Sequence, residues 1–502
     1  MLDLENKLEQ YFGYASFRTG QREIIEDVLA GKDVLGILPT GSGKSICYQL
    51  PARLLTGTVV VISPLISLMI DQVKQLKATG FKEVIAINSF MNRVEKERAL
   101  QQLSAYRLIY VSPEMLKNES FLKELLNCSV SLFVVDEAHC ISQWGHEFRP
   151  DYLKLHETIE RLNHPPILAL SATATPEVQM DIEHQLRSKH MVKHVYPMDR
   201  TNISFVVKSC EDEQEKKDYL VHLLQSFPVP TMIYFSSKKT AEKVAHELMR
   251  QLPCVRVAFY HGGMDQTDRV LIQQQFMNQQ LDVICCTSAF GMGINKQDIR
   301  LVVHFHLPTQ LESFIQELGR AGRDGKSSVS LVLTAPNDDY LPKVLLEGEL
   351  PKKEDIDLLF YDLKDVEECE VPFQQIEEKG WLNEIQLRFI QYQLENHAML
   401  KNGRILYNRN KWKTVKQAII QVITSRQVYK QMKLTQLLDW VSENGCRRKS
   451  LFSSFQKEVQ EPRYHCCDYC DFSFDDWLPE YEKQVTPSMN WQKRLQKILH
   501  QQ

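Results

Sequence analysis

The 502-residue sequence has no uninterrupted apolar run long enough to cross a lipid bilayer, so it predicts no membrane-spanning helix. Its first residues, MLDLENKLEQYFGY, are acidic and amphipathic and lack the basic and apolar regions of a signal or transit peptide. We therefore expect a protein of the cell interior. Hydrophobic residues make up 43% and charged residues 25% of the chain, which is typical of globular proteins.

The sequence also lacks a large net charge, since the formal value is −4. This value argues neither for nor against nucleic-acid binding, which needs only a local basic surface. Residues 401–470 hold fourteen basic residues against five acidic ones, whereas residues 347–380 hold twelve acidic residues against four basic ones. The basic region fits either a surface that attracts phosphates or an ordinary solvated face.

Disulfide-like spacing is absent from the cysteines of the first 370 residues. Four of the twelve cysteines instead gather near the end, at Cys446, Cys466, Cys467 and Cys470. In a chain without a secretory signal such a cluster favours a metal over disulfides, and four sulfur or nitrogen ligands suit zinc. Free structural thiols are the alternative.

The stretch DVLGILPTGSGKS, residues 33–45, predicts a buried strand, a glycine turn and the start of a helix. Amides at such a helix start bind polyphosphate, Lys44 neutralises charge, and the hydroxyl of Ser45 suits Mg²⁺. Leu38 stands where the strict phosphate-loop pattern has its first glycine, so a turn without a ligand is the alternative. We expect a nucleoside triphosphate site here.

The sequence DEAH, residues 136–139, follows an apolar run that predicts another strand of the same sheet. At a strand end, Asp136 would hold magnesium and Glu137 would orient and deprotonate the attacking water. An acidic pair in this position is often only a cap or a salt bridge. Its pairing with TGSGKS about ninety residues upstream favours the catalytic interpretation.

An aromatic segment, CISQWGHEFRPDY, comes directly after DEAH. Trp144 and Phe148, with His146 and Arg149 close by, form a combination that stacks on unpaired bases and contacts the nucleic-acid backbone. The alternative is that these aromatics pack into the core beneath a loop. The position next to Glu137 predicts a segment that couples base contact to hydrolysis.

Apolar strands alternate with helical patterns twice along the chain, which predicts an α/β fold of two doubly wound parallel-sheet lobes. The first lobe ends with PPILALSATATPEV, and the second follows the segment at 198–207. In the second lobe, Arg320 and Arg323 lie three residues apart at an expected helix start. From there they would reach phosphates across a cleft, although two such arginines are usually surface charges.

After residue 335 the pattern predicts three helices and a short ribbon, which is the outline of a winged helix. Such a module usually binds duplex DNA, with Arg404 and Arg409 as candidates here. A helical spacer without a direct role is an equal alternative, because no base-reading set is evident.

The ordered motifs resemble those of superfamily 2 helicases, and specifically the RecQ family, over about residues 10–335. The motifs are FRTGQREII, TGSGKS, SPLISLMIDQV, DEAHCISQWGHEFRPDY, SATA, FYHGGM, TSAFGMGINKQDIRLVVHF and QELGRAGRDG. The segment after DEAH and the TGQ element are the most specific to RecQ. Leu38 in place of the first glycine of the phosphate-loop pattern does not argue against the resemblance, because that superfamily does not require glycine there.

The resemblance implies a role for each matched position. Arg18 and Gln21 would recognise adenine, Ser171 and Thr173 would couple hydrolysis to movement, and Asp298 and Gly293 would line the cleft from the second lobe. The remaining implied ATP contacts are Thr40, Gly41, Ser42, Gly43, Lys44 and Ser45, with Arg320 and Arg323 sensing the γ-phosphate.

The region that holds the four clustered cysteines is similar to the zinc-binding domain of RecQ proteins. The similarity lies in the sequence CRR, residues 446–448, after an expected helix, and in CDYC, residues 467–470. The family pattern has a cysteine three residues before Cys467, where this chain has Tyr464. Cys466, or with less support His465, would therefore take that ligand's place beside Cys446, Cys467 and Cys470.

We expect lobe 1 at residues 1–200, lobe 2 at 201–340, the winged-helix module at 341–412, the zinc module at 413–475 and a polar tail at 476–502. The resemblance implies a short bacterial ATP-dependent DNA helicase with 3′-to-5′ polarity, acting in repair and recombination. Its cofactors would be ATP, Mg²⁺ and Zn²⁺. Its partners would be single-stranded, forked or partly duplex DNA, with single-strand-binding and recombination proteins, at the nucleoid in the cytoplasm. An RNA helicase and an ATP-gated clamp without unwinding are the alternatives.

Overall fold

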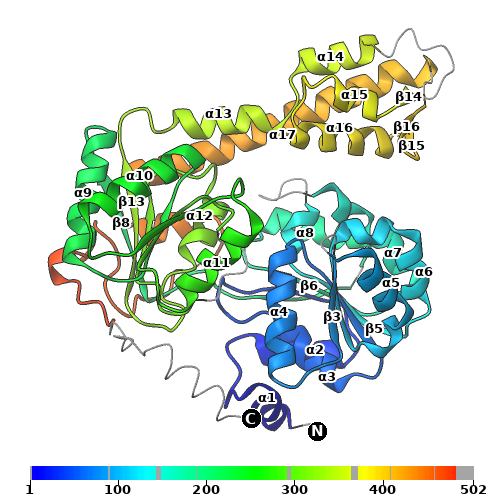
Figure 1. Ribbon diagram of the computed structural model, residues 1–502, viewed down its shortest axis with the longest axis horizontal. Coiled ribbons are helices and arrows are strands. Elements are labelled where there is room, and N and C mark those ends of the chain that lie inside the picture. Colours follow the sequence, from blue (N-terminus) through cyan, green and yellow to red (C-terminus); the bar gives the residue numbers. More distant parts are fainter. Residues whose placement is uncertain are drawn as a thin grey trace.

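The computed structural model describes residues 3–88, 91–142, 149–188, 190–290, 296–362, 371–406, 409–456 and 458–481. It has two lobes, each built on a sheet, and a helical region that extends from lobe 2 over lobe 1 (Figure 1). Within these ranges, no helix is both long and apolar enough to cross a membrane. The predicted class of two doubly wound lobes is confirmed by the topology of the two sheets.

Lobe 1 contains a seven-stranded parallel sheet in the order β3-β4-β2-β5-β6-β1-β7. The strands are β1 (Val34–Ile37), β2 (Thr58–Ile62), β3 (Val84–Ile87), β4 (Leu108–Val111), β5 (Val130–Val135), β6 (Ile167–Ser171) and β7 (Val192–Val195). The helices are α1 (Leu4–Phe12), α2 (Gln21–Leu29), α3 (Ile46–Leu54), α4 (Ile66–Ala78), α5 (Arg93–Gln101), α6 (Glu119–Leu126), α7 (Leu155–Arg161) and α8 (Pro176–Leu186).

The central strands of lobe 1 are apolar because both faces of the sheet are covered by helices. Along β1, Leu35 and Ile37 belong to one core cluster, whereas Val34 belongs to the cluster on the opposite face. Alternation of side chains along a strand, combined with burial on both sides, produces a continuous apolar run instead of an alternating one. The polar ends of these strands therefore stand out clearly in the sequence.

Lobe 2 has the same kind of architecture, a parallel sheet with helices between its strands. Its six strands lie in the order β10-β11-β9-β12-β13-β8. The strands are β8 (Ile203–Ser209), β9 (Thr231–Tyr234), β10 (Val257–Tyr260), β11 (Val283–Cys286), β12 (Leu301–His304) and β13 (Ser328–Thr334). The helices are α9 (Glu213–Ser226), α10 (Lys238–Gln251), α11 (Gln266–Met277) and α12 (Leu311–Leu318).

Two edge strands are not evident as strands in the sequence. β7 reads VKHV and alternates between half-buried and exposed residues, so its apolar content is low. β8 lies largely in the stretch 198–207, which we expected to be a connecting segment, and it pairs in parallel with β13. Pairing partners far along the chain decide such strands, and local apolar content does not reveal them.

The region after lobe 2 has the helices α13 to α18 and a three-stranded antiparallel sheet in the order β14-β16-β15, which includes the ribbon predicted from the sequence. Asn402 and Gly403 both have positive φ, of 52° and 72°, as the tight turn of the ribbon requires. The elements are α13 (Tyr340–Glu349), α14 (Lys353–Asp362), β14 (Val371–Pro372), α15 (Gln374–Glu378), α16 (Glu384–Asn396), β15 (Leu400–Lys401), β16 (Arg404–Ile405), α17 (Arg409–Ser442) and α18 (Arg447–Phe452).

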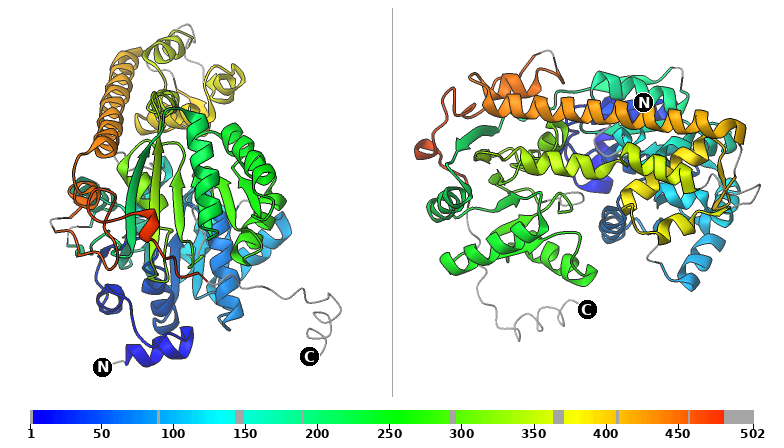
Figure 2. Two further views of the ribbon diagram at one scale, coloured as in Figure 1. Left: turned by 90° about the vertical axis from the view of Figure 1, so that its left-hand side faces the viewer. Right: turned by 90° about the horizontal axis from the view of Figure 1, so that it is seen from above.

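The 34-residue helix α17 joins this region to lobe 2 and runs along most of the molecule when seen from above (Figure 2). Near its start, Trp412 and Ile419 pack with the core of the small sheet and its helices. Near its end, Leu437 and Trp440 pack with the core that includes lobe 2. The small sheet and the helices packed against it form what we call the small module. The Nζ of Lys154 in lobe 1 lies 2.6 Å from Oε2 of Glu395 on α16, and this ion pair connects the small module to the first lobe.

The cysteine-bearing segment lies along the free edge of the lobe 2 sheet. Phe205 of β8 forms a parallel bridge with Cys467, and its amide donates to the carbonyl of Cys466 at 3.2 Å. The amide of Asp468 donates in turn to the carbonyl of Phe205 at 2.9 Å. The segment thus satisfies backbone groups that an edge strand would otherwise expose.

Candidate active site

The glycine turn between β1 and α3 adopts the loop conformation expected of a phosphate cradle. Gly41 and Gly43 have φ of 86° and 78°, a region that side chains with a Cβ rarely adopt. Gln21 donates from Nε2 to the carbonyls of Ser42 and Gly43 at 2.8 and 3.1 Å, and Arg18 donates from Nη1 to the carbonyl of Gly41 at 2.6 Å. The TGQ element therefore braces the loop by its carbonyl oxygens.

The acidic pair follows β5 and faces this loop. Asp136 is buried, and burial together with the neighbouring Glu137 raises the pKa of Asp136 to about 7, against the opposing effect of Lys44. Lys44 Nζ lies 3.7 Å from Oε2 of Glu137, which has a left-handed φ of 49°. Burial disfavours the charged form of this carboxyl group unless a cation lies beside it, and this environment fits Mg²⁺.

A buried histidine connects the acidic pair with the SATA turn. Nδ1 of His139 lies 3.5 Å from Oε2 of Glu137 and 3.0 Å from Oγ of Ser171. The same hydroxyl oxygen accepts from the amide of Thr173 at 3.4 Å. In the sequence, His139 stands out only as part of DEAH. The structure makes it the link between the carboxylate and the residues predicted to couple hydrolysis to movement.

Two arginines of lobe 2 lie against the phosphate loop of lobe 1. We expected these arginines at the start of a helix, and that expectation is wrong. They follow the C-terminal end of α12 in a turn that we call the arginine turn, residues 319–325. The contact is close, because a Cβ added to Gly41 would lie 3.0 Å from Cγ of Arg323. Arg320 is buried, and its Nε has no hydrogen-bond partner among the described residues.

The site concentrates positive charge. Burial, and then repulsion from neighbouring guanidinium groups with Arg320 first, lowers the pKa of Arg323 to about 9. Burial and the charge of Arg18 similarly lower the pKa of Arg200 to about 10. Guanidinium groups held this close repel one another unless an anion lies between them. A polyphosphate is an anion of the right charge and size.

Arg200 has no assigned role in the sequence, although it lies in the segment between the lobes. Its Nη1 donates to the carbonyl of Gly319 at 2.9 Å and to that of Thr40 at 3.4 Å, and its Nη2 donates to the carbonyl of Gly322. One side chain thus contacts the phosphate loop and the arginine turn. No motif identifies it, since a single arginine in a connecting segment has no local signature.

The glycine turn, the acidic pair, Arg320 and Arg323 line one cleft of about 520 Å³ between the lobes. Asp298 is not among the residues that line it. Asp298 instead lies 2.8 Å from Nζ of Lys296 and accepts from Gln279 at 3.3 Å, while its neighbour Gln297 lines the cleft. Gly293 falls outside the described residues. The cleft-lining residues are Tyr14, Ser16, Arg18, Gln21, Thr40, Gly41, Gly43, Lys44, Ser45, Ile46, Leu65, Leu68, Gln72, Gln75, Asp136, Glu137, Ala172, Gln297, Gln316, Arg320 and Arg323.

The aromatic segment after DEAH is described only in part. Trp144, His146 and Phe148 lie outside the described residues. Arg149 is described, and its Nη1 donates to the carbonyl of Pro64 at 2.9 Å, next to the loop that follows β2. The end of the segment is thereby attached to the same edge of the lobe 1 sheet as the acidic pair.

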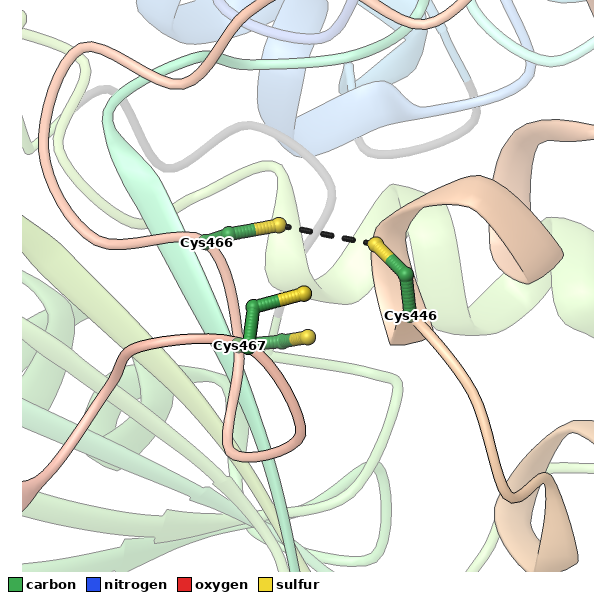
Figure 3. A group of neighbouring side chains, drawn as sticks. Cys446, Cys466 and Cys467 are labelled. Atoms are coloured by element: carbon green, nitrogen blue, oxygen red, sulfur yellow. Dashed lines mark hydrogen bonds between the residues drawn. The ribbon is translucent and has the colours of Figure 1, made fainter.

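The four clustered cysteines come together at a single point. Their Sγ atoms all lie within 4.8 Å of one another, and those of Cys446 and Cys466 are 3.6 Å apart and point toward each other (Figure 3). Tetrahedral zinc with bonds near 2.3 Å separates its sulfur ligands by about 3.8 Å, so the donor set fits zinc. His465 is not part of this group, since its Nδ1 lies 3.6 Å from Oδ2 of Asp471.

The fit extends to the protonation of the thiols. A hydrogen bond from Cys466 lowers the pKa of Cys467 to about 5, which favours the thiolate form of Cys467. Burial and neighbouring thiolate character raise the pKa of Cys470 to about 12. Zinc binds the thiolate form of cysteine, so a metal at this point would bind the four sulfurs with release of their protons.

Comparisons with known proteins agree with this geometry. A family model described as DEAD/DEAH box helicase matches residues 18–182, and one described as Helicase conserved C-terminal domain matches residues 215–325. The chain is 40% identical over 501 residues to the probable ATP-dependent DNA helicase RecS of Bacillus subtilis, covering 99% of this chain and 98% of that protein. It is also 40% identical over 351 residues to the ATP-dependent DNA helicase RecQ of Haemophilus influenzae, covering 69% of this chain and 56% of that protein. The chain thus matches little more than half the length of that RecQ.

Solved structures share the fold at low identity. The DEAD-box helicase Mss116, bound to single-stranded RNA, matches with a TM-score of 0.58 at 17% identity, over 91% of this chain and 96% of that one. The helicase Lhr of Mycobacterium smegmatis, bound to single-stranded DNA, matches with a TM-score of 0.56 at 18% identity, over 82% of this chain and 61% of that one. At such identity these matches support only the two-lobed architecture.

Proposed function

Because this chain belongs to the RecQ family of ATP-dependent DNA helicases, we propose that it hydrolyses ATP to move 3′-to-5′ along single-stranded DNA and to separate duplex DNA ahead of it. The observation that carries the proposal is the convergence of both lobes on one cleft. Lys44 and the pair Asp136 and Glu137 come from lobe 1, whereas Arg320 and Arg323 come from lobe 2. The expected biological role is DNA repair and recombination.

ATP would bind with its phosphates on the loop from Thr40 to Ser45 and its adenine near Arg18 and Gln21. A side-chain amide offers one donor and one acceptor, which suits the adenine edge. Gln21 and Arg18 also brace the loop, so base recognition would be linked directly to the shape of the phosphate cradle. Ser45 and Asp136 would hold the Mg²⁺ that accompanies ATP, and the ion would neutralise phosphate charge.

Hydrolysis would use groups from both lobes. Glu137 orients the attacking water and accepts its proton, and Lys44 stabilises charge on the phosphates. Arg320 and Arg323 stabilise the charge that develops on the γ-phosphate in the transition state. Loss of that phosphate removes the anion between the arginines, and their repulsion favours opening of the cleft.

Movement along DNA would follow from this cycle of closing and opening. The His139 contacts give a direct route from Glu137 to Ser171 and Thr173 at the end of β6. Trp144, His146, Phe148 and Arg149, which follow the acidic pair in sequence, would contact unpaired bases and the backbone. A strand held by both lobes would therefore advance once for each ATP hydrolysed.

The zinc module and the small module would complete the enzyme. Cys446, Cys466, Cys467 and Cys470 would hold one structural zinc ion, which supplies folding energy to a segment with little core of its own. The winged-helix module expected at residues 341–412 would contact the duplex, with Arg404, which is exposed on the ribbon, and Arg409 as candidates. We expect single-strand-binding and recombination proteins as partners at the bacterial nucleoid.

The test is ATP hydrolysis by the purified chain alone, with a single-stranded DNA oligonucleotide, and with the matching RNA. Stimulation by DNA alone supports a DNA motor, whereas equal stimulation by RNA would move the substrate class to RNA. Strand displacement is then measured on duplexes with a 3′ or a 5′ overhang, with Glu137→Gln as the inactive control. Hydrolysis without displacement on either substrate would reject unwinding in favour of an ATP-gated clamp.

A further inference from the structure

The segment between the lobes is held from one side by residues 446–456 and 458–470, which we call the cysteine module. The amide of Met198 donates to Oε1 of Gln456 at 2.9 Å, and the amide of Asp199 donates to the same oxygen at 3.4 Å. The amide of Arg463 donates to the carbonyl of Thr201 at 2.8 Å. We refer to residues 198–203 as the interlobe linker. Its backbone is thus fixed by residues more than 250 positions away in the chain.

The principal contact is made by Arg448 on α18, two residues after Cys446. This side chain is only 1% exposed, and its Nη1 donates to Oδ1 of Asp199 and, at 3.2 Å, to the carbonyl of Arg200. Its Nη2 donates to the carbonyl of Ile203. The guanidinium carbon lies 4.9 Å from the ring centroid of Phe205. Arg448 therefore contacts Asp199, Arg200 and Ile203 of the linker, and it also contacts Phe205 of β8.

The opposite side of the linker holds the arginine turn. Arg200 donates to the carbonyls of Gly319 and Gly322 in the turn, and to that of Thr40 in the phosphate loop. Asn202 donates from Nδ2 to the carbonyls of Gly322 and Lys326, both at 2.8 Å. The position of the turn relative to the phosphate loop therefore depends on how these two linker side chains are held.

These two sets of contacts share one backbone, since Arg448 binds the carbonyl of Arg200 itself. We propose that Arg448 and Arg200 are positioning residues, through which the cysteine module sets the placement of Arg320 and Arg323 at the γ-phosphate. The inference rests on the proposed ATP hydrolysis. It extends that proposal, because the cysteine module would then affect the rate of ATP hydrolysis without contacting ATP.

The geometry favours arginine over any other cation at position 448. A guanidinium group offers donors in a planar fork and serves several acceptors at once, whereas an ammonium group is a single point charge on a flexible stem. Lysine at this position would keep a charge beside Asp199 but lose part of the contacts to the two backbone carbonyls. The linker would then gain freedom without leaving a buried carboxylate unpaired.

The test compares Arg448→Lys with Arg447→Lys in the full chain. Arg447 is the matched control, because it is the neighbouring arginine of α18 and none of its partners lies in the linker. It donates to the carbonyls of Trp440, Val441 and Glu443, and its Nε donates to Oδ1 of Asp468 at 3.2 Å. Zinc content, thermal melting, kcat and KM for ATP are measured with saturating single-stranded DNA. A small displacement of a catalytic group is enough to reduce kcat about tenfold, and this is the loss expected for Arg448→Lys with KM and zinc content nearly unchanged.

A double-mutant cycle separates positioning from general damage. If Arg448 acts through the arginine turn, Arg448→Lys adds little to the loss caused by Arg323→Lys alone, because the positioned group is already missing. Additive losses, or a kcat for Arg448→Lys equal to that of the control, would overturn the inference. If Arg448→Lys fails to fold, Arg200→Lys is put through the same cycle with the same two criteria. An inactive wild-type chain would instead reject the proposed hydrolysis, so the two failures are distinguishable.

Discussion

Substitution of Lys433 by methionine should destabilise the protein strongly, although Lys433 lies far from the cleft. Its Nζ lies 2.6 Å from Oε1 of Glu312, and this pair joins α17 to α12, the helix that leads into the arginine turn. The two residues are only 8% and 6% exposed. Burial lowers the pKa of Lys433, but Glu312 outweighs that effect and the net shift is upward, so the lysine is charged at neutral pH.

The size of the effect follows from what methionine leaves behind. Methionine fills most of the lysine volume, but it leaves Glu312 buried without its cation, and Oε2 of Glu312 already lacks a hydrogen-bond partner among the described residues. Removal of one partner of a buried ion pair costs about 3–5 kcal/mol. In a lobe of this size that loss corresponds to a decrease in Tm of roughly 10 °C.

The assay is thermal melting of Lys433→Met, Glu312→Gln and the double variant. The double variant should be more stable than the sum of the single losses predicts, with a coupling of at least about 1 kcal/mol, because it leaves no unpaired charge. Lys416→Met is the control on the same helix. Lys416 pairs with Asp357 at 2.7 Å, but both side chains are partly exposed to solvent, so only a small change is expected. A Tm for Lys433→Met equal to that of this control would refute the reasoning.

Three further predictions concern the sites themselves. Cys470→Ser should lower zinc content and Tm more than it lowers basal ATP hydrolysis, and unchanged metal content and melting would contradict a zinc site with four cysteine ligands. Gly41→Ala should abolish most ATP hydrolysis while the fold is kept, because φ is 86° and the new Cβ would lie 3.0 Å from Cγ of Arg323; wild-type kcat and KM would show that the loop and arginine turn are not in contact. Trp144→Ala should leave basal hydrolysis near wild type and weaken its stimulation by single-stranded DNA, and undiminished stimulation would remove the proposed coupling role.

The two lobes and the meeting of TGSGKS with DEAH were predictable because each depends on local sequence. Strands of a parallel sheet are buried on both faces, so each appears as an apolar run followed by polar residues. All such ends meet at one edge of the sheet. TGSGKS and DEAH, about ninety residues apart, could therefore be assigned to one site, and Lys44 lies 3.7 Å from Glu137.

The position of the arginine turn was predicted less well. The glycines of QELGRAGRDG indicated a phosphate contact, but the expected helix start is a turn after the end of α12. Either arrangement places Arg320 and Arg323 close together, so local spacing could not separate them. The approach of both Cys466 and Cys467 to the same point likewise depends on the loop's path along β8, which supplies the backbone partners for that path.

The sequence by itself determined the fold class, the phosphate loop, the acidic pair and the four cysteines, since short-range patterns encode each of them. Only the tertiary structure decided that Arg200 joins both lobes and that Arg448 holds the linker beneath it. These contacts join residues up to 249 positions apart, and single arginines outside any motif give no periodic or compositional signal. Their partners are mostly backbone carbonyls, which are present at every position of the chain, so the fold alone selects which of them an arginine reaches.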